Sequence, residues 1–484
     1  MRSFIAVCVI ALAGCSLVPK FEQPTVEVPA RYKELREDER GTWKEAQPAD
    51  AIPRGEWWRI FRDATLDALE SEAIAANQNL KSAAARVAQS RALLGITAAD
   101  RYPQGTVGVG PTRAQFSAAS QGLPDGTKLS PTTIWRAPLT LSYEVDLFGR
   151  VSSSVSAAEN DLASNEALYQ SVLLSLQADL AQTYFSLRAV DAELDVLRET
   201  VRSREDNVRI LQRRFDLGDI SELDLARAKT ELSTTRTEAI GLERTRAQLE
   251  HALAVLLGKP PASLAVTPAP LTTDVPRIPP GLPSALLERR PDIAAAQRRM
   301  IASNARIGVA RSAFFPSLNL TGQAGFESNE LSNLFNWSSR AWILGPLFGT
   351  MLSLPLFDGG RRRGNVDRTW AVLDESIADY RQSVLVAFAD VEDNLSGLRV
   401  LNEQSISTQE SLASATRALR LADTRYRVGA TSYIDVIAAQ RDVLTIQRQN
   451  VQIAGARAAS TVALIRALGG GWDAPAVTGA SDTK

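Results

Sequence analysis

The chain has 484 residues, with 54 Lys and Arg against 55 Asp and Glu, so its formal net charge at pH 7 is −1. This balance gives no electrostatic reason to expect nucleic acid as a partner. One histidine, His251, and two cysteines, Cys8 and Cys15, are too few for a Cys/His metal site or a disulfide framework, and His251 lies in a regular helical pattern unsuited to a catalytic triad. We therefore expect no metal, no cofactor and no enzymatic activity.

The N-terminus has the features of a bacterial secretion signal. An apolar run from Phe4 to Leu12 is too short to anchor the chain across a bilayer. It ends in Leu12-Ala13-Gly14-Cys15, which resembles the lipobox of bacterial lipoproteins. We predict a signal peptide over residues 1–14 and lipid attachment at Cys15, with Ser16 favouring the outer membrane because an Asp there often signals inner-membrane retention. The alternative is a plain signal peptide with an incidental cysteine.

Residues 15–56 form a predicted extended tail rather than a domain, because they carry five prolines among charged residues. Such a tail must lie against another part of the protein. A first structural repeat is predicted over residues 57–258. It begins with apolar packing at Trp57 and continues with helices at 65–76 and 79–100.

A strict alternation of apolar and polar residues predicts β-strands. One side carries Leu139, Leu141, Tyr143, Val145 and Leu147, and the other carries Thr140, Ser142, Glu144 and Asp146. Residues 317–321 and 352–356 repeat the pattern. These strands fit either a half-exposed soluble sheet or a transmembrane β-barrel, in which Glu144 and Asp146 would face the lumen. We expect four strands per chain, and because small closed barrels need about eight, a barrel requires several chains.

Residues 151–217 contain neither Pro nor Gly, which predicts one unbroken helix from 151 to about Phe215. At 1.5 Å per residue it would be about 98 Å long. Its apolar residues recur at the spacing of a coiled coil, with one break at Arg204. A second helix is predicted from Ser221 to about Leu257, and the helix at 79–100 could stack end to end on it. Each repeat would then contain one unbroken and one two-piece helical strut.

The turn between these two helices occurs twice. The residues Phe215, Gly218, Ser221 and Asp224 recur 211 positions later as Tyr426, Gly429, Ser432 and Asp435. The two glycines suit the left-handed conformation that ends a helix, and the two serines suit the N-cap of the helix that follows. The chain is therefore a tandem duplication of about 200 residues, with a tight turn, here called the tip, in each helical hairpin.

A proline-rich segment separates the two copies. Residues 259–283 contain eight prolines and form a predicted linker. The second repeat is predicted over 284–469, followed by a flexible tail at 470–484. We interpret Arg289-Arg290-Pro291-Asp292 as structural, since Pro and Asp both suit the first turn of a helix.

Blocks along almost the whole chain resemble the outer-membrane channel family typified by TolC, in its OprM-like lipoprotein branch. They include Tyr143 to Arg150, Arg289 to Ile293, Ile307 to Pro316, Pro355 to Arg361 and Leu468 to Gly471. The resemblance implies an α+β membrane protein and a homotrimer. Its transmembrane β-barrel of twelve strands, four from each chain, would be continuous with a long periplasmic α-helical barrel. It also implies a periplasmic adaptor protein, an inner-membrane resistance-nodulation-division transporter and outer-membrane lipid as partners.

The resemblance also implies a gate at the closed periplasmic end. In that family an aromatic residue before the tip glycine and an Asp after it take part in gating contacts, and these positions match Tyr426 and Asp435. Thr431 replaces a bridging Arg of the type member and Ala438 replaces a second Asp, so Arg425 or Arg427 would have to substitute for the bridge. The alternative is that Asp435 only caps its helix. We expect the tips, with Gly218, Ser221, Gly429 and Ser432, to contact the adaptor.

The leading functional prediction is a passive outer-membrane exit duct of a tripartite drug-efflux system. The alternative within transport is a channel for metal-ion efflux or type I protein secretion. A lipid-anchored coiled-coil scaffold without a pore belongs to a different class, and the alternating strands with acidic residues on the polar side argue against it.

Overall fold

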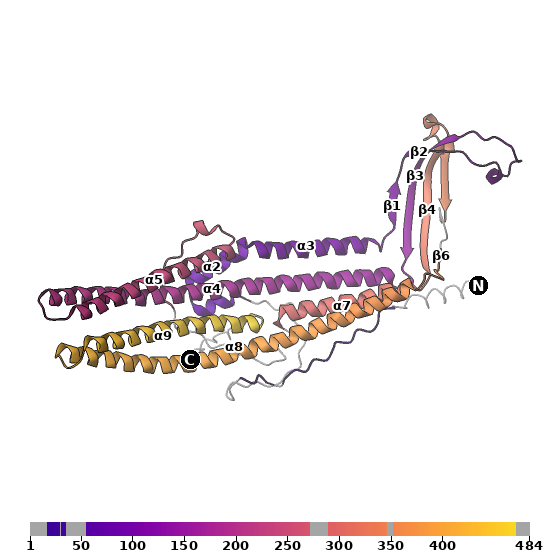
Figure 1. The fold of residues 1–484 in the computed structure, drawn as a ribbon. Helices are drawn as coiled ribbons and strands as arrows, with labels where there is room; N and C mark the ends of the chain where they lie inside the picture. Colours follow the sequence, from indigo (N-terminus) through magenta and orange to yellow (C-terminus); the bar gives the residue numbers. More distant parts are fainter. Residues whose placement is uncertain (1–16, 30, 35–54, 272–288, 346–351, 471–484) are drawn as a thin grey trace, which may run out of the picture. The chain divides into compact units, whose positions relative to one another are not determined.

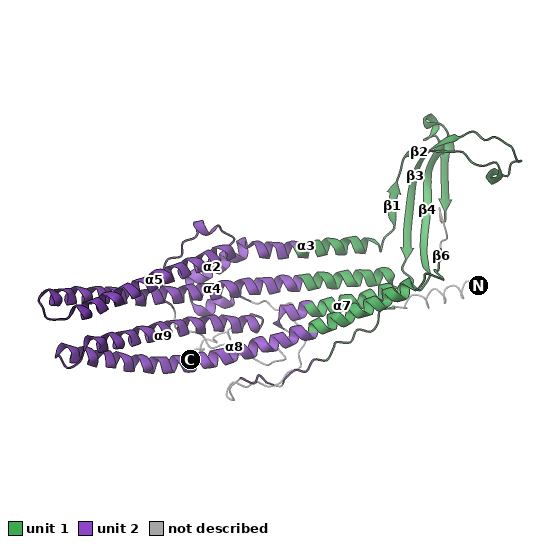
Figure 2. Ribbon diagram, viewed as in Figure 1, with its two compact units in different colours: residues 1–25, 86–165, 296–380 green, residues 26–85, 166–295, 381–484 purple. Residues whose placement is uncertain are grey.

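The computed structural model describes residues 17–29, 31–34, 55–271, 289–345 and 352–470 (Figure 1). The chain forms two compact units, shown in different colours in Figure 2. Unit 1 comprises residues 1–25, 86–165 and 296–380, and unit 2 comprises residues 26–85, 166–295 and 381–484. Each unit takes residues from both sequence repeats, so the repeats are interleaved rather than folded as separate domains.

Unit 1 contains an antiparallel sheet whose described segments fill four strand positions. The segments are β1 (Gln104–Val107), β2 (Gly110–Ala114), β3 (Thr132–Val145), β4 (Ser317–Ser328), β5 (Arg340–Leu344) and β6 (Leu352–Ser353). β3 pairs with β4, while β1 and β2 pair with successive stretches of the other edge of β3. β5 and β6 pair in the same way with β4. The predicted four positions are confirmed, and the two outer ones are interrupted.

The register between β3 and β4 separates an apolar face from a polar face, since directly opposed residues share a face. The apolar pairs include Leu141 with Gly322 and Tyr143 with Leu320. The polar pairs are Arg136 with Glu327, Thr140 with Gln323, Ser142 with Thr321 and Glu144 with Asn319. On the apolar face, Leu139, Leu141 and Leu320 are 43–48% exposed in the single chain. The predicted alternation is therefore confirmed over this pair of strands.

Three details of the strand prediction are wrong. β3 ends at Val145, and the N–H of Leu147 bonds to the Val145 carbonyl at 2.8 Å in a turn, so Asp146 and Leu147 leave the strand. β6 ends at Ser353 instead of reaching residue 356. Strand β5 was missed, because its continuous run Ala341-Trp342-Ile343-Leu344 has no polar alternation to reveal it.

Two helical hairpins of equal size are the longest elements. They consist of α4 (Arg150–Asp216) with α5 (Glu222–Leu256), and α8 (Arg361–Arg427) with α9 (Tyr433–Ala467). α4 and α8 have 67 residues each, and α5 and α9 have 35 each. The predicted unbroken helix is confirmed in both copies. Across the residues that the structure describes, no helix is both long and apolar enough to span a bilayer.

Residues just before two of the shorter helices contact the open ends of the hairpins in unit 2. The shorter elements are η2 (Trp57–Phe61), α2 (Ala64–Ala76), α3 (Gln78–Ala99), η3 (Ala119–Gln121), η4 (Pro261–Ser263), α7 (Pro291–Ser312), η5 (Leu331–Asn333) and η6 (Trp337–Ser339). The Asn77 amide, before α3, donates to the Leu256 carbonyl of α5 at 2.8 Å. Arg290, before α7, donates to the Ala467 carbonyl of α9 at 3.2 Å and pairs with Asp390 at 2.9 Å. The predicted two-piece struts are confirmed at these junctions, as is the structural role of Arg290.

The described part of the N-terminal tail is extended and packs on helices of its own unit. In unit 1 the Pro19 carbonyl accepts from Asn304 of α7 at 2.9 Å. In unit 2 the Glu392 carboxylate of α8 accepts from the backbone N–H groups of Lys33 and Glu34 at 2.6 and 3.0 Å. The predicted tail is confirmed over these residues. The predicted signal peptide, Cys15, residues 272–283 of the linker and residues 471–484 of the flexible tail lie outside the described residues.

The core of unit 2 lies where η2 and α2 pack on α4. Trp57 and Phe61 belong to a buried cluster with Tyr184 and Phe185, and the rings of Phe61 and Phe185 are 4.7 Å apart. The predicted start of apolar packing at Trp57 is confirmed. Glu70 of α2 is completely buried beside this cluster, and neither of its carboxylate oxygens has a hydrogen-bond partner among the described residues.

Candidate functional site

The two tips, both in unit 2, have the same backbone geometry. Gly218 and Gly429 have φ values of 82° and 75°, a region that glycine enters without steric penalty. In the first tip the N–H groups of Gly218 and Asp219 bond to the carbonyls of Phe215 and Arg214 at 2.9 and 2.8 Å. The second tip repeats these bonds at the same distances 211 residues later. Each long helix therefore ends in a Schellman motif, as the glycine positions predict.

The serine caps are also confirmed. Ser221 precedes α5, and its hydroxyl accepts from the N–H of Asp224 at 3.3 Å. Ser432 precedes α9, and its hydroxyl accepts from the N–H of Ile434 at 3.3 Å. Each cap satisfies an amide that the first helical turn leaves free, so the chain reverses direction within a few residues.

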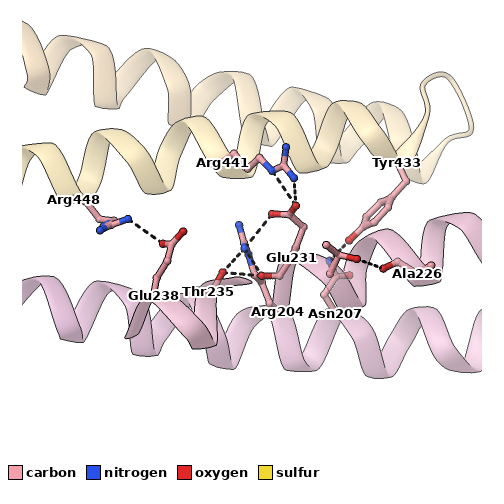
Figure 3. Close-up of polar contacts among 10 residues, drawn as sticks. Arg204, Asn207, Ala226, Glu231, Thr235, Glu238, Tyr433, Arg441 and Arg448 are labelled. Atoms are coloured by element: carbon pink, nitrogen blue, oxygen red, sulfur yellow. Dashed lines mark hydrogen bonds and ion pairs between the residues drawn. The ribbon is translucent and has the colours of Figure 1, made fainter. Parts of the chain in front are cut away.

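Tyr426 lies in the contact between the two hairpins. Its ring centroid is 5.3 Å from that of Tyr433 at the start of α9, and its hydroxyl accepts from Arg214 of α4 at 3.5 Å. The Tyr433 hydroxyl accepts from the Asn207 amide of α4 at 2.7 Å (Figure 3). Burial raises the pKa of Tyr433 to about 12. These contacts extend an apolar cluster formed by Leu211, Leu225, Ala228, Tyr433, Val436 and Ile437.

Asp435 lies in the first turn of α9, where its carboxylate is near the positive end of the helix dipole. It accepts a hydrogen bond from the hydroxyl of Thr431 in the same tip. In the first tip, the Asp224 carboxylate accepts from the Ser221 hydroxyl at 3.0 Å. The helix-capping alternative for Asp435 is therefore compatible with its local contacts, and its role in a gate stays a prediction.

A buried ion pair fills the break in the coiled-coil pattern. Arg204 of α4 lies 3.2 Å from the Glu231 carboxylate of α5, and the two side chains are only 7% and 8% exposed. Arg204 also donates to the Glu231 carbonyl at 2.8 Å and to the Thr235 hydroxyl. Burial lowers the pKa of Arg204, and the neighbouring Glu231 carboxylate opposes that shift. Sequence reasoning missed this pair, although the single charged residue in an apolar heptad position was its signal.

Glu231 also joins the two hairpins. It accepts from Arg441 of α9 at 2.9 Å, while Arg204 approaches it from the other side (Figure 3). Seven residues further along both helices, Glu238 of α5 pairs with Arg448 of α9 at 3.0 Å. Arg448 also bonds to Glu193 of α4 at 2.8 Å. A spacing of seven is two turns of a coiled coil, so both arginines of α9 lie on one side facing α4 and α5.

The predicted lumen residues lie at the end of β3 in unit 1. Glu144 is on the polar face of the sheet, and Arg150 donates to it through Nε at 2.6 Å and Nη2 at 2.7 Å. Asp146 accepts from the N–H groups of Val151 and Ser152 at 3.0 and 2.7 Å, which caps α4. The pKa of Asp146 is lowered because these hydrogen bonds outweigh its partial burial. That either residue faces a lumen stays a prediction.

No group of three or more His, Cys, Asp or Glu side chains suited to a metal ion occurs within the described ranges. The residues that sequence analysis singled out at the tips all lie in unit 2, and among them Tyr426 contacts the other hairpin through Arg214. Glu144 and Asp146 belong to unit 1, and Cys15 is not among the described residues.

Comparison with known proteins shows which family has this sequence and fold. The family described as outer membrane efflux protein matches residues 69–259 and 282–470, once in each repeat. The toluene efflux pump outer membrane protein TtgF of Pseudomonas putida is 35% identical over 478 residues, covering 96% of this chain and 95% of its own. The cation efflux system protein CusC of Escherichia coli is 32% identical over 466 residues, covering 96% and 97%. The CmeC outer membrane channel of Campylobacter jejuni has a similar structure, with a TM-score of 0.85, 27% identity and 95% coverage of each chain.

Proposed function

Since the chain belongs to the outer membrane efflux protein family, we propose that it is the passive exit duct of a tripartite drug-efflux system. It is an outer-membrane protein with a channel fold. In the proposal, an inner-membrane resistance-nodulation-division transporter supplies energy and selects the substrate. A periplasmic adaptor protein connects that transporter to this chain, and no reaction is catalysed.

The main support for this proposal is the difference between the two faces of the β3–β4 pair. A strand pair with one apolar and one polar face matches a barrel wall between lipid and water. The four strand positions of one chain are about half of what a small closed barrel needs. One chain therefore cannot close a barrel alone, and the three copies that the family resemblance implies would contribute twelve positions. In that assembly Glu144 would face the lumen, and a lipid group on Cys15 would add an anchor in the outer membrane.

The tips support the proposed adaptor contact. Leu217 and Val428, directly before the tip glycines, are 79% and 75% exposed. Exposed apolar side chains at equivalent positions of both tips would give a partner a repeated contact. The capped turns around Gly218, Ser221, Gly429 and Ser432 would hold these side chains in a fixed geometry.

The proposal is tested in a strain that lacks its own outer-membrane efflux channels but retains a transporter and adaptor encoded with this chain. Expression of the wild-type chain should lower intracellular accumulation of a fluorescent drug. The Gly429→Pro variant should reach the outer membrane but lose this activity, because Pro cannot adopt the positive φ of the tip. Unchanged accumulation with correctly inserted wild-type protein would contradict drug efflux.

The second candidate is metal-ion efflux, which is favoured by the similarity to CusC, named as part of a cation efflux system. A passive duct needs no resident metal site, so the exported substrate would be set by its transporter. Growth of the same strains on a series of transition-metal salts separates the two candidates. Protection against the salts but not against drugs would favour metal-ion efflux, and protection against neither would leave type I protein secretion to be tested.

A further inference from the structure

The apolar face of the sheet in unit 1 has two charged residues within the described strands, and both are arginines. The register places Arg113 of β2 opposite Thr133 of β3, and Arg340 of β5 opposite Phe326 of β4. By strand alternation, Thr133 and Phe326 share the face of Leu141. Both arginine side chains are exposed in the single chain. The other charged residues of these strands lie on the polar face and are Arg136, Glu144 and Glu327.

The charged residues of the two faces differ in their partners. On the polar face Arg136 pairs with Glu327 at 3.0 Å, and Glu144 pairs with Arg150 at 2.6 Å. Neither Arg113 nor Arg340 forms an ion pair with a carboxylate in the part of the chain that the structure describes. An arginine facing lipid is unfavourable at the middle of a bilayer and nearly neutral at its surface. These two arginines therefore need a position near the membrane surface and an anion from outside the chain.

Their position along the strands meets the first need. Helices α4, α7 and α8 all join the sheet at one end, and Arg113 and Arg340 lie towards the other end (Figure 1). Arg340 is level with Ala137 of β3, eight residues from Val145 at the helical end, and Arg113 is level with Thr133, twelve residues from it. On strands tilted by about 40°, these levels are about 21 and about 31 Å from Val145. The apolar band of an outer-membrane barrel is about 25 Å tall, so both levels are near its far edge.

The guanidinium of Arg340 is held in place by Trp337. Its Nε donates to the Trp337 carbonyl at 2.7 Å, and its Cζ lies 3.2 Å from the centroid of the Trp337 ring. No hydrogen bond to either Nη group of Arg340 occurs within the described residues. Two parallel N–H donors on a fixed guanidinium match two oxygens of a phosphate. Arg340 is therefore oriented to bind a phosphate before one arrives.

Aromatic rings surround Arg340 on the same side of the sheet. The rings of Phe326 and Phe335 meet edge to face at 5.6 Å, and Phe326 lies directly opposite Arg340. Trp342 follows on the same face of β5, and Trp337 and Trp342 are 74% and 71% exposed. Exposed aromatic side chains of this kind occur where acyl chains meet lipid headgroups. The surface thus combines an apolar region with a cation at its edge, which fits an amphipathic ligand that has acyl chains and a phosphate.

We propose that Arg113 and Arg340 bind phosphate groups of phosphorylated glycolipids in the outer leaflet of the outer membrane, while Trp337 and Trp342 contact their acyl chains. The proposal rests on the orientation of the proposed duct, whose helices lie on the periplasmic side. The far end of the sheet then lies in the outer leaflet, where the phosphates are attached to sugars. The two arginines are on β2 and β5, three strand positions apart, so each binds a separate phosphate.

Lipid binding by the full-length protein, purified in detergent and stripped of lipid, tests the proposal. The probes are an acylated glucosamine disaccharide with two phosphates and the same lipid without phosphate, counted on the protein by native mass spectrometry. The wild type should bind the phosphorylated form at least tenfold more tightly. Arg113→Gln/Arg340→Gln should lose this preference, whereas Arg136→Gln, at a similar level on the polar face, should keep it.

Two further measurements separate the phosphate contact from other causes. Arg340→Lys keeps the charge but not the paired donors, so it should retain only part of the preference. It also decides the test if the double variant does not assemble. Binding should persist in excess EDTA, because the arginines rather than a divalent cation neutralise the phosphates. Phosphatidylglycerol, an anionic phospholipid, should bind more weakly than the phosphorylated glycolipid.

Several outcomes would overturn the proposal. These are equal binding of the two glycolipids by the wild type, an unchanged preference in both Arg113→Gln/Arg340→Gln and Arg340→Lys, an equal loss in Arg136→Gln, or release of the lipid by EDTA. Equal binding of phosphatidylglycerol, or displacement by an equal concentration of inorganic phosphate, would show a general anion site instead. A wild type that prefers the phosphorylated glycolipid but does not lower drug accumulation would contradict drug efflux and leave the lipid site intact. A chain that exports drugs without this preference would contradict the lipid site alone.

Discussion

Arg204 and Glu231 form an ion pair that is almost completely shielded from water, with 3.2 Å between nitrogen and oxygen and exposures of 7% and 8%. Glu231→Gln would leave the Arg204 guanidinium buried without its counter-charge. Removing one partner of a buried pair costs about 3–5 kcal/mol. We therefore expect a lower free energy of unfolding by that amount, measured by urea unfolding in detergent. Arg204→Leu/Glu231→Leu should recover most of it, because neither charge remains buried.

The control is Glu238→Gln, two helical turns further along α5. Glu238 and Arg448 also form an ion pair across the hairpins, at 3.0 Å, but their side chains are 39% and 31% exposed. Exposed pairs contribute about 0–1 kcal/mol, so this variant should unfold almost like the wild type. Equal losses for the two variants would mean that burial of Glu231 does not determine its contribution.

Glu70 should make the protein less stable as pH rises. Burial, and secondarily the charge of Asp67, raise the pKa of Glu70 from its ordinary value of 4.5 to about 9. A carboxyl group that binds its proton more tightly when folded favours the folded state below pH 4.5, and this contribution is lost as pH rises towards 9. The loss is at most about 1.4 kcal/mol per pH unit. Glu70→Gln should remove this slope, so its advantage in melting temperature over the wild type should grow between pH 5 and 9.

Glu70→Ala serves as the control for volume. It also removes the titration but leaves a cavity, so its melting temperature should be lower than that of Glu70→Gln at every pH while its pH slope is equally flat. Parallel curves for wild type and Glu70→Gln would contradict a protonated Glu70.

The regular elements could be predicted from sequence because each has a local cause. Helix α4 follows from the absence of Pro and Gly in residues 151–217, and α8 follows from the sequence repeat although it contains Gly364 and Gly397. The ends of both helices follow from Gly218 and Gly429. Strands β3 and β4 follow from strict alternation. β5 could not be found in this way, because Trp342 and Ile343 lie on opposite faces although both are apolar.

The contacts between hairpins could not be predicted to the same extent. The pairing of Glu231 with Arg441 joins residues that are 210 positions apart, and no local pattern specifies which of many surface charges meet. Arg204 was noticed only as an interruption of an apolar pattern. The structural role of Arg204 depends on its contacts with Glu231 and Thr235 of the antiparallel helix α5. The register of α5 against α4 is set by the length of the tip.

Gly429→Ala should loosen the second tip. At a φ of 75°, a Cβ atom costs about 1–2 kcal/mol even though no other atom lies near it. Amide hydrogen exchange should therefore accelerate around residues 426–435. Gly397→Ala, in the interior of α8 with open space around it, should instead stabilise its helix by about 0.5–1 kcal/mol. Slower exchange at the tip of Gly429→Ala would be inconsistent with the left-handed end of α8.

Cys15 should carry a lipid group in the mature protein. Cys15→Ala is expected to lose that modification, and Cys8→Ala should retain it, because the predicted cleavage removes residue 8. Mass spectrometry of the mature N-terminus distinguishes the two variants. A single acyl chain anchors a protein only marginally, at about 0.8 kcal/mol per buried methylene, so several chains on one cysteine would be needed for a durable anchor. A wild-type N-terminus that begins elsewhere and has no added mass would refute the prediction.

The last prediction concerns the gate at Tyr426 and Asp435. In a homotrimer three copies of Asp435 would face a narrow mouth if the second tips converge on its axis, and like charges there would attract cations. Asp435→Asn keeps an oxygen for the Thr431 hydroxyl but removes three charges, so cation selectivity and block by divalent cations should weaken in planar bilayers. Asp224→Asn, the same change in the first tip, is the matched control and should have little effect. Tyr426→Phe should raise conductance if the hydroxyl, now 3.5 Å from Arg214, holds the hairpins together when the mouth is closed. Unchanged conductance, selectivity and block in Tyr426→Phe/Asp435→Asn would place the gate elsewhere in the channel.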